Sequence, residues 1–470
     1  MKFDVLPNLV LLEIFDFYLC KEEQKHAPSK ERLHAWCTLV HVCRRWRDLV
    51  FGSPRRLGLQ LFYDAEKPLE IEKLGIWPPL PIAICADMQE DSDVHDVNIV
   101  PVLEHNHRIG RIDVKEFPVS KLENVLAAMH QPFPALIFLQ LWSGNEDELV
   151  SAIPDSFLGG SAPHLQTLIL DHIPFPGLPN LLLSATHLVE ITLFRIPYSM
   201  YLPPEMMVDC LSVLSRLEVL IFEFESSQSR DDQNSRPSPA PTRVFLPVLT
   251  EFCYRGLNTY LEGLVAPIDA PLLDKLEIFL FHEPIMDTPE LTQFINRSPN
   301  LNLEAHDNAQ VQFVPEKVSV SFRWASNKWL ELGISYEESY LELSSLAQLC
   351  TSSFPQGLIP AVGHLSINWY DPLESLDLEY AGNSQWLELL RPFTGARVLY
   401  ICQETVPRIA PALQELVGER VTEVLPGLVR LETTFTTPGR VHEGIAEFVS
   451  ARQLSGNPIA LSCRRVTFPW

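Results

Sequence analysis

The chain has 470 residues, 46% of them apolar, which is enough for several average domains or for one small module followed by a repeat array. Lysines and arginines number 36 against 60 aspartates and glutamates, so the formal net charge is −24. Because an acidic body repels phosphate, and DNA affinity grows with the number of phosphates neutralised, this balance argues against a nucleic-acid-binding protein.

The stretch LPNLVLLEIFDFYL, residues 6–19, predicts a first helix that is apolar almost all round. Pro7 suits the first turn of a helix. In the helix body Glu13 and Asp16 stand three residues apart and form one narrow polar stripe. A helix with so little polar surface must be buried on more than one side.

Residues from about Arg32 to Val50 predict a second helix with one apolar face. That face consists of Leu39, Val42, Cys43, Trp46, Leu49 and Val50. Arginines flank it, and we expect a solvated border that can attract an acidic partner: Arg44, Arg45, Arg47, Arg55 and Arg56. A unit of about fifty residues cannot easily bury this much apolar surface alone, so it needs the rest of the chain or a partner.

The two segments, LP…VLLEIF followed by LVHVCRRWRDLV, resemble the F-box, the helical module that docks onto the adaptor subunit of SCF (Skp–cullin–F-box) ubiquitin ligases. The resemblance implies an F-box-like module over residues 1–55 that binds a Skp-family adaptor and, through it, cullin. The docking residues implied by the two matching helices are Leu6, Pro7, Leu12, Ile14, Phe15, Val42, Cys43, Trp46 and Leu49. The chain departs from the family at Leu9, a position that is often acidic, and in the connecting stretch 20–36, which is longer than usual. An ordinary helical hairpin that caps the large domain is the alternative interpretation.

From about Arg56 onward the template L-x-x-L-x-L, with other apolar residues allowed, recurs along the chain. Matches begin at Ile109, Leu136, Leu165, Leu188, Leu217, Leu249 and Leu273, with gaps of 27, 29, 23, 29, 32 and 24 residues. Further matches begin at Val362 and Leu428, and VLYIC at 398–402 is another strand candidate. A proline stands two residues before the first template position in five cases: Pro134, Pro163, Pro247, Pro271 and Pro426.

Between these predicted strands lie helix-like segments such as SKLENVLAAMHQ and TPELTQFINRS. A unit of strand, loop and helical return cannot bury its apolar face alone, so neighbouring units stack into a solenoid with a parallel sheet on its concave face. The predicted fold class is therefore mixed α/β: a short helical module, then an irregular leucine-rich-repeat-like solenoid over residues 56–470. Over nearly the whole chain this organisation is similar to the F-box-plus-repeat proteins of mushroom-forming (basidiomycete) fungi.

Several segments make the predicted array irregular. The asparagine that usually follows the third leucine is replaced by Ile173, Ile196 and Glu225. No repeat fits well between about 300 and 355. Residues 226–242, rich in serine, proline and other polar residues, predict a disordered surface loop. Residues from about 440 to 470 predict a helix, a turn and a closing strand that cap the last repeat.

The sequence predicts no catalytic, cofactor-binding or metal-binding residues. A phosphate-binding GxxxxGK[ST] motif is absent, and HEGIA at 442–446 lacks the second histidine of HExxH. His105 and His107, with His95 nearby, have no further ligand spacing, so solvated loop histidines are the favoured interpretation. Nine separate cysteines without a CxxC pair indicate reduced thiols.

These patterns predict a binding subunit and not an enzyme. We expect an F-box substrate receptor whose helices bind the SCF adaptor and whose repeats bind a protein target, without a cofactor, nucleic acid or membrane partner. No signal peptide or run of 18 apolar residues is found, so an intracellular protein, cytoplasmic or nuclear, is expected. Two alternatives stay open: a leucine-rich-repeat scaffold unconnected with ubiquitination, and a hydrolase, which would need a deep pocket with convergent histidine and carboxylate groups.

Overall fold

The computed structural model describes residues 6–23, 32–54, 56–64, 80–88, 98–144, 152–174, 178–197, 202–225, 243–283, 286–301, 307–314, 316–324, 328–336, 343–370, 382–434 and 443–464. The chain divides into two compact units, residues 1–188 and 189–470. Helices alternate with strands that mostly pair in parallel, which confirms the predicted mixed α/β fold with a predominantly parallel sheet. The predicted loop at 226–242 lies outside the described residues.

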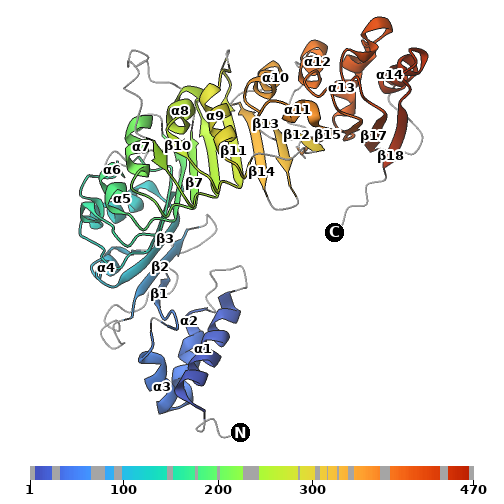
Figure 1. Cartoon of the computed structure of the whole chain (residues 1–470). Coiled ribbons are helices and arrows are strands. Elements are labelled where there is room, and N and C mark those ends of the chain that lie inside the picture. The colour runs from blue at the N-terminus through green and yellow to red at the C-terminus, as the bar shows by residue number, and fades with distance from the viewer. Residues whose placement is uncertain are drawn as a thin grey trace. The chain divides into compact units, whose positions relative to one another are not determined.

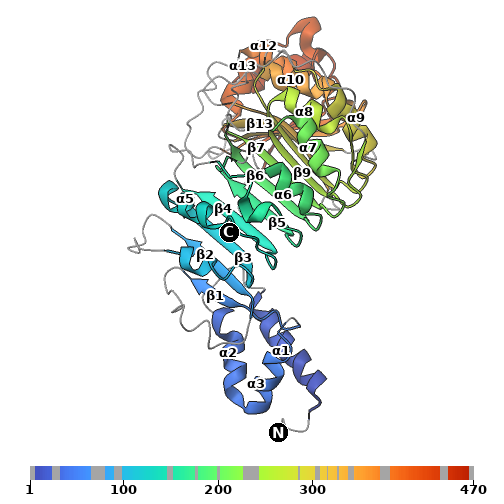
Figure 2. The same cartoon turned by 90° about the vertical axis from the view of Figure 1, so that its left-hand side faces the viewer.

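Three helices open the first unit: α1 (Asn8–Glu23), α2 (Arg32–Val42) and α3 (Arg44–Phe51), which lie side by side (Figure 1, Figure 2). The prediction of one continuous helix from Arg32 to Val50 is wrong, because the helix is interrupted at Cys43. Cys43 has an extended backbone, with φ −159° and ψ 168°, and its Sγ accepts a hydrogen bond from the backbone N–H of Trp46 at 3.4 Å. A residue with this conformation and a side-chain acceptor begins a new helix, so two helices share the predicted apolar face.

The first unit continues with five parallel strands that follow chain order. They are β1 (Leu61–Asp64), β2 (Ile82–Asp87), β3 (Ile109–Phe117), β4 (Phe138–Ser143) and β5 (Thr167–Asp171). The connections contain α4 (Val100–Leu103), α5 (Val119–Ala128), a 3-10 helix (Phe157–Gly160) and α6 (Leu178–Ser184). β1 and β2 precede the first template match, so the repeat pattern did not predict them.

The second unit contains a sheet with the strand order β6-β7-β9-β11-β14-β13-β12-β15-β16-β17-β18. Its strands are β6 (Glu190–Ile196), β7 (Val219–Phe224), β9 (Glu251–Gly256), β11 (Lys275–Phe281), β12 (Asn308–Val314), β13 (Lys317–Arg323), β14 (Trp329–Ser335), β15 (His364–Trp369), β16 (Val398–Ile401), β17 (Arg430–Thr434) and β18 (Ala460–Arg464). Short β8 (Val244–Phe245) and β10 (Ile268–Asp269) form a separate parallel pair. The helices are α7 (Pro204–Leu211), α8 (Asn258–Val265), α9 (Pro289–Arg297), α10 (Leu343–Ser352), α11 (Leu358–Ala361), α12 (Asn383–Leu390), α13 (Val406–Gln414), a 3-10 turn (Gly418–Thr422) and α14 (Glu443–Leu454).

One part of this sheet departs from the predicted parallel array. β13 runs antiparallel to both of its neighbours, β12 and β14, whereas β14 is parallel to β11 and β12 is parallel to β15. The β12–β13 hairpin closes where Val314 pairs with Lys317, and Glu316 has a φ of 64° there. A wholly parallel sheet is therefore wrong for residues 308–335, which lie in the segment where no template match was found.

A repeated turn explains where the predicted strands begin. The first template residue donates its backbone N–H to the carbonyl three residues earlier, as Leu165 does to Ala162 at 3.1 Å. The strand then starts two residues later. The same bond recurs at Leu136, Leu188, Leu217, Leu249, Leu273, Val362 and Leu428. Pro163 and its counterparts occupy the second position of this turn, which their fixed φ favours.

The core of the second unit lies between its helices and one face of its sheet. Buried and half-exposed residues alternate along strands such as β7 and β9, so successive side chains point to opposite faces. The half-exposed set forms the second face, termed the open face, and the helices of the described segments lie on the other side (Figure 1). Ile196, at an expected asparagine position, is 3% exposed, so it packs in the core instead of bonding the loop backbone.

Candidate functional site

The docking residues predicted for the helical module differ in exposure. Leu12 and Phe15 are 6% and 0% exposed, so they hold the helices together and do not themselves contact a partner. The exposed members are Pro7, Ile14, Val42 and Cys43, and the half-buried members are Leu6, Trp46 and Leu49. The predicted set therefore contains both surface residues and core residues of the module.

Further apolar residues of α1 are exposed that the predicted set does not include: Leu9, Val10, Phe17 and Tyr18. At 100° per residue they lie with Ile14 within about half of the helix circumference. We term these five residues the α1 surface. Leu9 and Phe17 are 68% and 64% exposed. Clustered large apolar side chains on a small module mark an interaction site, and the all-round apolar sequence of residues 6–19 was the signal for it.

Aromatic contacts hold the three helices together beneath this surface. The rings of Phe15 and Trp46 have centroids 4.7 Å apart and connect α1 to α3. Trp36 and Phe51, with centroids 5.9 Å apart in an edge-on arrangement, connect α2 to α3. Such ring pairs contribute about 1 kcal/mol beyond the area they bury, so the module has its own small core.

Most of the described arginines in the module are tied to its helices instead of forming the predicted solvated border. Arg45 Nη2 donates to the carbonyl of Leu6 at 2.5 Å and to Oδ1 of Asn8 at 2.8 Å. Arg47 Nε donates to the carbonyl of Val40 at 3.0 Å.

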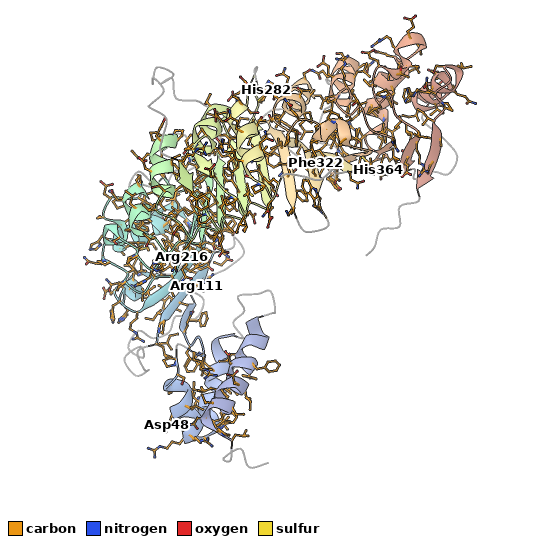
Figure 3. All side chains as sticks on the ribbon, in the orientation of Figure 1. Asp48, Arg111, Arg216, His282, Phe322 and His364 are labelled. Atoms are coloured by element: carbon orange, nitrogen blue, oxygen red, sulfur yellow. The ribbon has the colours of Figure 1, made fainter. Side chains whose placement is uncertain are left out.

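Two further pairs complete this description. Arg56 pairs with Glu13 of α1. Arg44 fits the prediction, since its side chain is exposed and lies 3.9 Å from that of Asp48, which is labelled in Figure 3 and is also exposed. Arg55 lies outside the described residues.

A second candidate site is the open face of the sheet in the second unit, on strands β6 to β14. Two rows of Cα partners cross these strands. The first row consists of Glu190, Val219, Glu251, Lys275 and Trp329, and the second of Thr192, Ile221, Cys253, Glu277 and Glu331. The leucine template predicted most of these strands, but it did not indicate that four glutamates would be brought together.

Lys275 is the cation within these two rows. Its Nζ lies 2.7 Å from Oε1 of Glu251 and 3.4 Å from Oε1 of Glu277. Burial lowers the pKa of Lys275, but the hydrogen bond to Glu251 and the nearby negative charges outweigh burial and raise it overall. Burial, together with Glu251, raises the pKa of Glu190 against the hydrogen bond from Thr192. One lysine therefore leaves this part of the face with excess negative charge.

Glu331 is the most buried carboxylate of the two rows, at 7% exposed. Ser319 Oγ donates to its Oε1 at 2.5 Å, and Trp329 Nε1 donates to its Oε2 at 3.0 Å. Burial raises the pKa of Glu331 despite these two hydrogen bonds, and the charge of Glu277 acts in the same direction. Both carboxylate oxygens have a donor, so this side chain is a satisfied part of the sheet.

The thiol of Cys253 lies between the carboxylates of Glu251 and Glu277. Its Sγ lies 3.6 Å from Oε1 of Glu251 and 3.9 Å from Oε2 of Glu277. Burial, then the charge of Glu277, raises the pKa of this thiol. A thiol held protonated in this way is a poor nucleophile, because the thiolate is the reactive form.

Metal-binding side chains do not converge in the described segments. No group of three or more His, Cys, Asp or Glu side chains there could hold a metal ion. His105 and His107 lie in the turn after α4, and His95 lies outside the described residues. A pocket of about 610 Å³ beside α5 is lined by residues such as Phe117, Lys121 and Val125, with no histidine or carboxylate in its lining.

Comparison with known proteins gives little further information. No protein-family model matches the sequence, and no curated protein matches it. Among solved structures, the leucine-rich repeat-containing protein LegL7 from Legionella pneumophila aligns over 84% of this chain and 98% of its own, with 12% identity and a TM-score of 0.26. A TM-score this low supports no conclusion about fold or function. No helix within the described ranges is long and apolar enough to cross a membrane.

Proposed function

We propose that the chain is an F-box substrate receptor of an SCF ubiquitin ligase. The observation that carries the proposal is the α1 surface, a run of exposed apolar side chains on a module whose sequence resembles the F-box. Ile14 and Val42 are 44% and 56% exposed, and both belong to the docking set that the resemblance implies. A surface of this kind on a module with its own small core favours a partner over burial within the module.

In this role the chain performs no chemistry. The α1 surface and the end of α2 bind the Skp-family adaptor, and the adaptor connects the chain to cullin. The repeats bind a protein target through the open face. The contribution to ubiquitin transfer is proximity, because holding the target raises the effective concentration of its lysines near the charged ubiquitin carrier.

A second candidate is a leucine-rich-repeat scaffold that works without ubiquitination. The observation that favours it is the bonding of the module, in which Arg45 and Arg47 tie the helices together and Arg56, directly after the module, pairs with Glu13. A module whose helices are bonded to one another in this way can cap the first repeats without binding a partner. The two candidates differ in whether the α1 surface binds the adaptor.

The experiment compares adaptor binding by exposed-residue variants of the full chain. Ile14→Asp combined with Val42→Asp places two charges on the docking surface, and we expect affinity for purified Skp-family adaptor to fall at least about 100-fold. The matched control is Leu183→Asp combined with Leu454→Asp, since both leucines are exposed and lie elsewhere. Phe15→Ala is a poorer test because Phe15 is wholly buried, so its loss would disturb the fold of the module.

Isothermal titration calorimetry measures affinity, and circular dichroism checks that each variant is folded. Tight binding by the wild type and the control, with loss in the double variant, supports the receptor. If the folded wild-type chain does not bind the adaptor, or the double variant binds equally well, the scaffold is the better description.

A further inference from the structure

The open face of the second unit carries a charge distribution that indicates what it binds. Glu190 and Glu251 are both Cα partners of Val219, which lies on the strand between them. Neighbouring strands are about 4.8 Å apart, so the two glutamates are about 10 Å apart at the backbone and can both reach a group held above Val219. Val219 and Ile221, two residues apart on β7, are half-exposed and offer an apolar floor.

The cations on the described strands β6 to β14 already have interaction partners, and they include Arg195 on β6. Lys275 forms ion pairs with both Glu251 and Glu277. Arg255, further along β9, lies 3.7 Å from a carboxylate oxygen of Glu223 and 3.6 Å from one of Glu316.

The two cations of β13 are stacked on rings. The guanidinium of Arg323 lies 3.8 Å from the ring centroid of Trp329, and Nζ of Lys317 lies 4.3 Å from that of Phe279. Within the two rows, four glutamates therefore stand against one lysine, and Glu190 lies at the end of the first row that is separated from Lys275 by Val219 and Glu251.

We infer that this part of the open face binds an extended polypeptide segment that presents a lysine or arginine beside an apolar residue. The inference rests on the proposed function for the identity of the partner, which would be the target of the receptor. The cationic group lies between Glu190 and Glu251, and the aliphatic stem of the same side chain packs on Val219. Glu277 and Trp329 supply a further carboxylate and an aromatic anchor along the same two rows.

Charge complementarity selects this occupant over others. An acidic segment would be repelled by the same glutamates, and a second copy of the chain would bring its own net charge of −24. The two rows cross five strands, a span of about 19 Å, which matches about six residues of an extended segment. The structure thus specifies a short basic and apolar motif.

The test uses a fluorescein-labelled octapeptide of lysine, leucine and serine, and a counter-peptide with glutamate at each lysine position. Binding to the full chain is followed by fluorescence anisotropy at low and high salt. The variant Glu190→Gln combined with Glu251→Gln keeps side-chain shape and removes two charges. The control, Glu415→Gln combined with Glu447→Gln, removes two charges from exposed glutamates on α13 and α14 or beside them.

We expect the lysine peptide to bind the wild type and the control alike, at least about 10-fold more weakly to the Glu190/Glu251 variant, and more weakly at high salt. The glutamate peptide should not bind. No binding to the wild type up to about 1 mM, or equal weakening in both variants, would overturn the inference. Adaptor binding is measured on the same samples, so failure of this surface is distinguished from failure of the proposed receptor function.

Discussion

Arg452, on α14, shows how this chain satisfies backbone groups at a turn without an asparagine ladder. The side chain is 0% exposed, and its guanidinium donates to the carbonyls of Val421 at 3.2 Å, Leu425 at 2.9 Å and Leu428 at 3.5 Å. Arg297, on α9, donates to three carbonyls of an earlier repeat in the same way. Buried carbonyls need a donor, and the planar five-donor guanidinium can serve several at once.

We therefore predict that Arg452→Met lowers the free energy of unfolding by about 3 kcal/mol, because it removes the side-chain donor to the carbonyls of Val421 and Leu428 and one of the two donors to that of Leu425. The urea midpoint of the full chain measures the loss. Arg216, an exposed residue labelled in Figure 3, provides the control, and Arg216→Met should change stability by less than about 0.5 kcal/mol. If the Arg452→Met chain were as stable as the wild type, the free energy lost by desolvating the buried guanidinium would equal the free energy gained from its hydrogen bonds.

Glu331 allows a prediction about pH. Its pKa is raised in the folded chain, chiefly by burial, so the folded state holds the proton more tightly than the unfolded state. The stability that this group contributes is present at acidic pH and is lost as pH rises through the folded pKa. Glu331→Gln removes the ionisation and can still accept from Trp329 Nε1 while its amide donates to Ser319 Oγ.

The expected result is a higher urea midpoint for Glu331→Gln than for wild type at about pH 7, with the difference shrinking toward about pH 4. Glu447→Gln, at an exposed glutamate, is the comparison for the general effect of removing one negative charge. A difference that stays constant across this pH range would show that ionisation of Glu331 is not its cause.

At the scale of elements, the turn before each strand is set by local chemistry. Leu217 donates to the carbonyl of Leu214 as its counterparts do, but Ser215 occupies the position that holds proline in five other repeats. Ser215 is exposed, so a proline ring there meets solvent. Proline at this turn position restricts the unfolded chain while keeping the native φ.

Ser215→Pro should accordingly raise the free energy of unfolding by about 0.4–1 kcal/mol. Arg216→Pro, one position later in the same turn, should lower it, since proline there forces the preceding residue out of its turn conformation. Differential scanning calorimetry of the two variants measures whether the first proline raises the stability of the chain and the second lowers it. If the two prolines had equal effects, the turn geometry would not be the cause.

These turns also explain what could be predicted from the sequence. Leu165 and Leu273 indicated strands correctly because both are buried first residues of a repeat and both make the turn bond that precedes the strand. The β12–β13–β14 meander could not be found this way, because antiparallel neighbours need no helical return and leave no repeat period. The break at Cys43 was missed because apolar spacing is the same for one helix or for two with a sulfur cap between them.

The candidate surfaces were harder to predict than the fold. The F-box-like motif indicated Ile14 and Val42 by residue type, but exposure separated them from Phe15, which the same motif includes. The glutamate cluster of the open face depends on register, since Glu190 and Glu251 are far apart in sequence and meet through the pairing of β6, β7 and β9. A linear pattern contains no information about such lateral neighbours.

At the scale of the whole molecule, strands mostly pair with strands that come next to them in chain order. In the helical module, aromatic pairs and arginine bonds join residues from within positions 6 to 56. In each sheet a strand pairs with its immediate neighbours, and outside the β12–β14 meander these follow chain order apart from the short β8 and β10. Repeat proteins built in this way derive their stability from neighbouring units, so a terminal segment can be removed without dismantling the rest.

Deletion of residues 1–55 should therefore leave a folded repeat region. We expect cooperative urea unfolding and strand content by circular dichroism close to those of the full chain, because Leu57 and Leu59, which are buried, and strand β1 are retained. The shortened chain should lose adaptor binding and keep affinity for the lysine peptide. Loss of cooperative unfolding would instead show that α1, α2 and α3 are a required cap for the first repeats, and this outcome would favour the scaffold over the receptor.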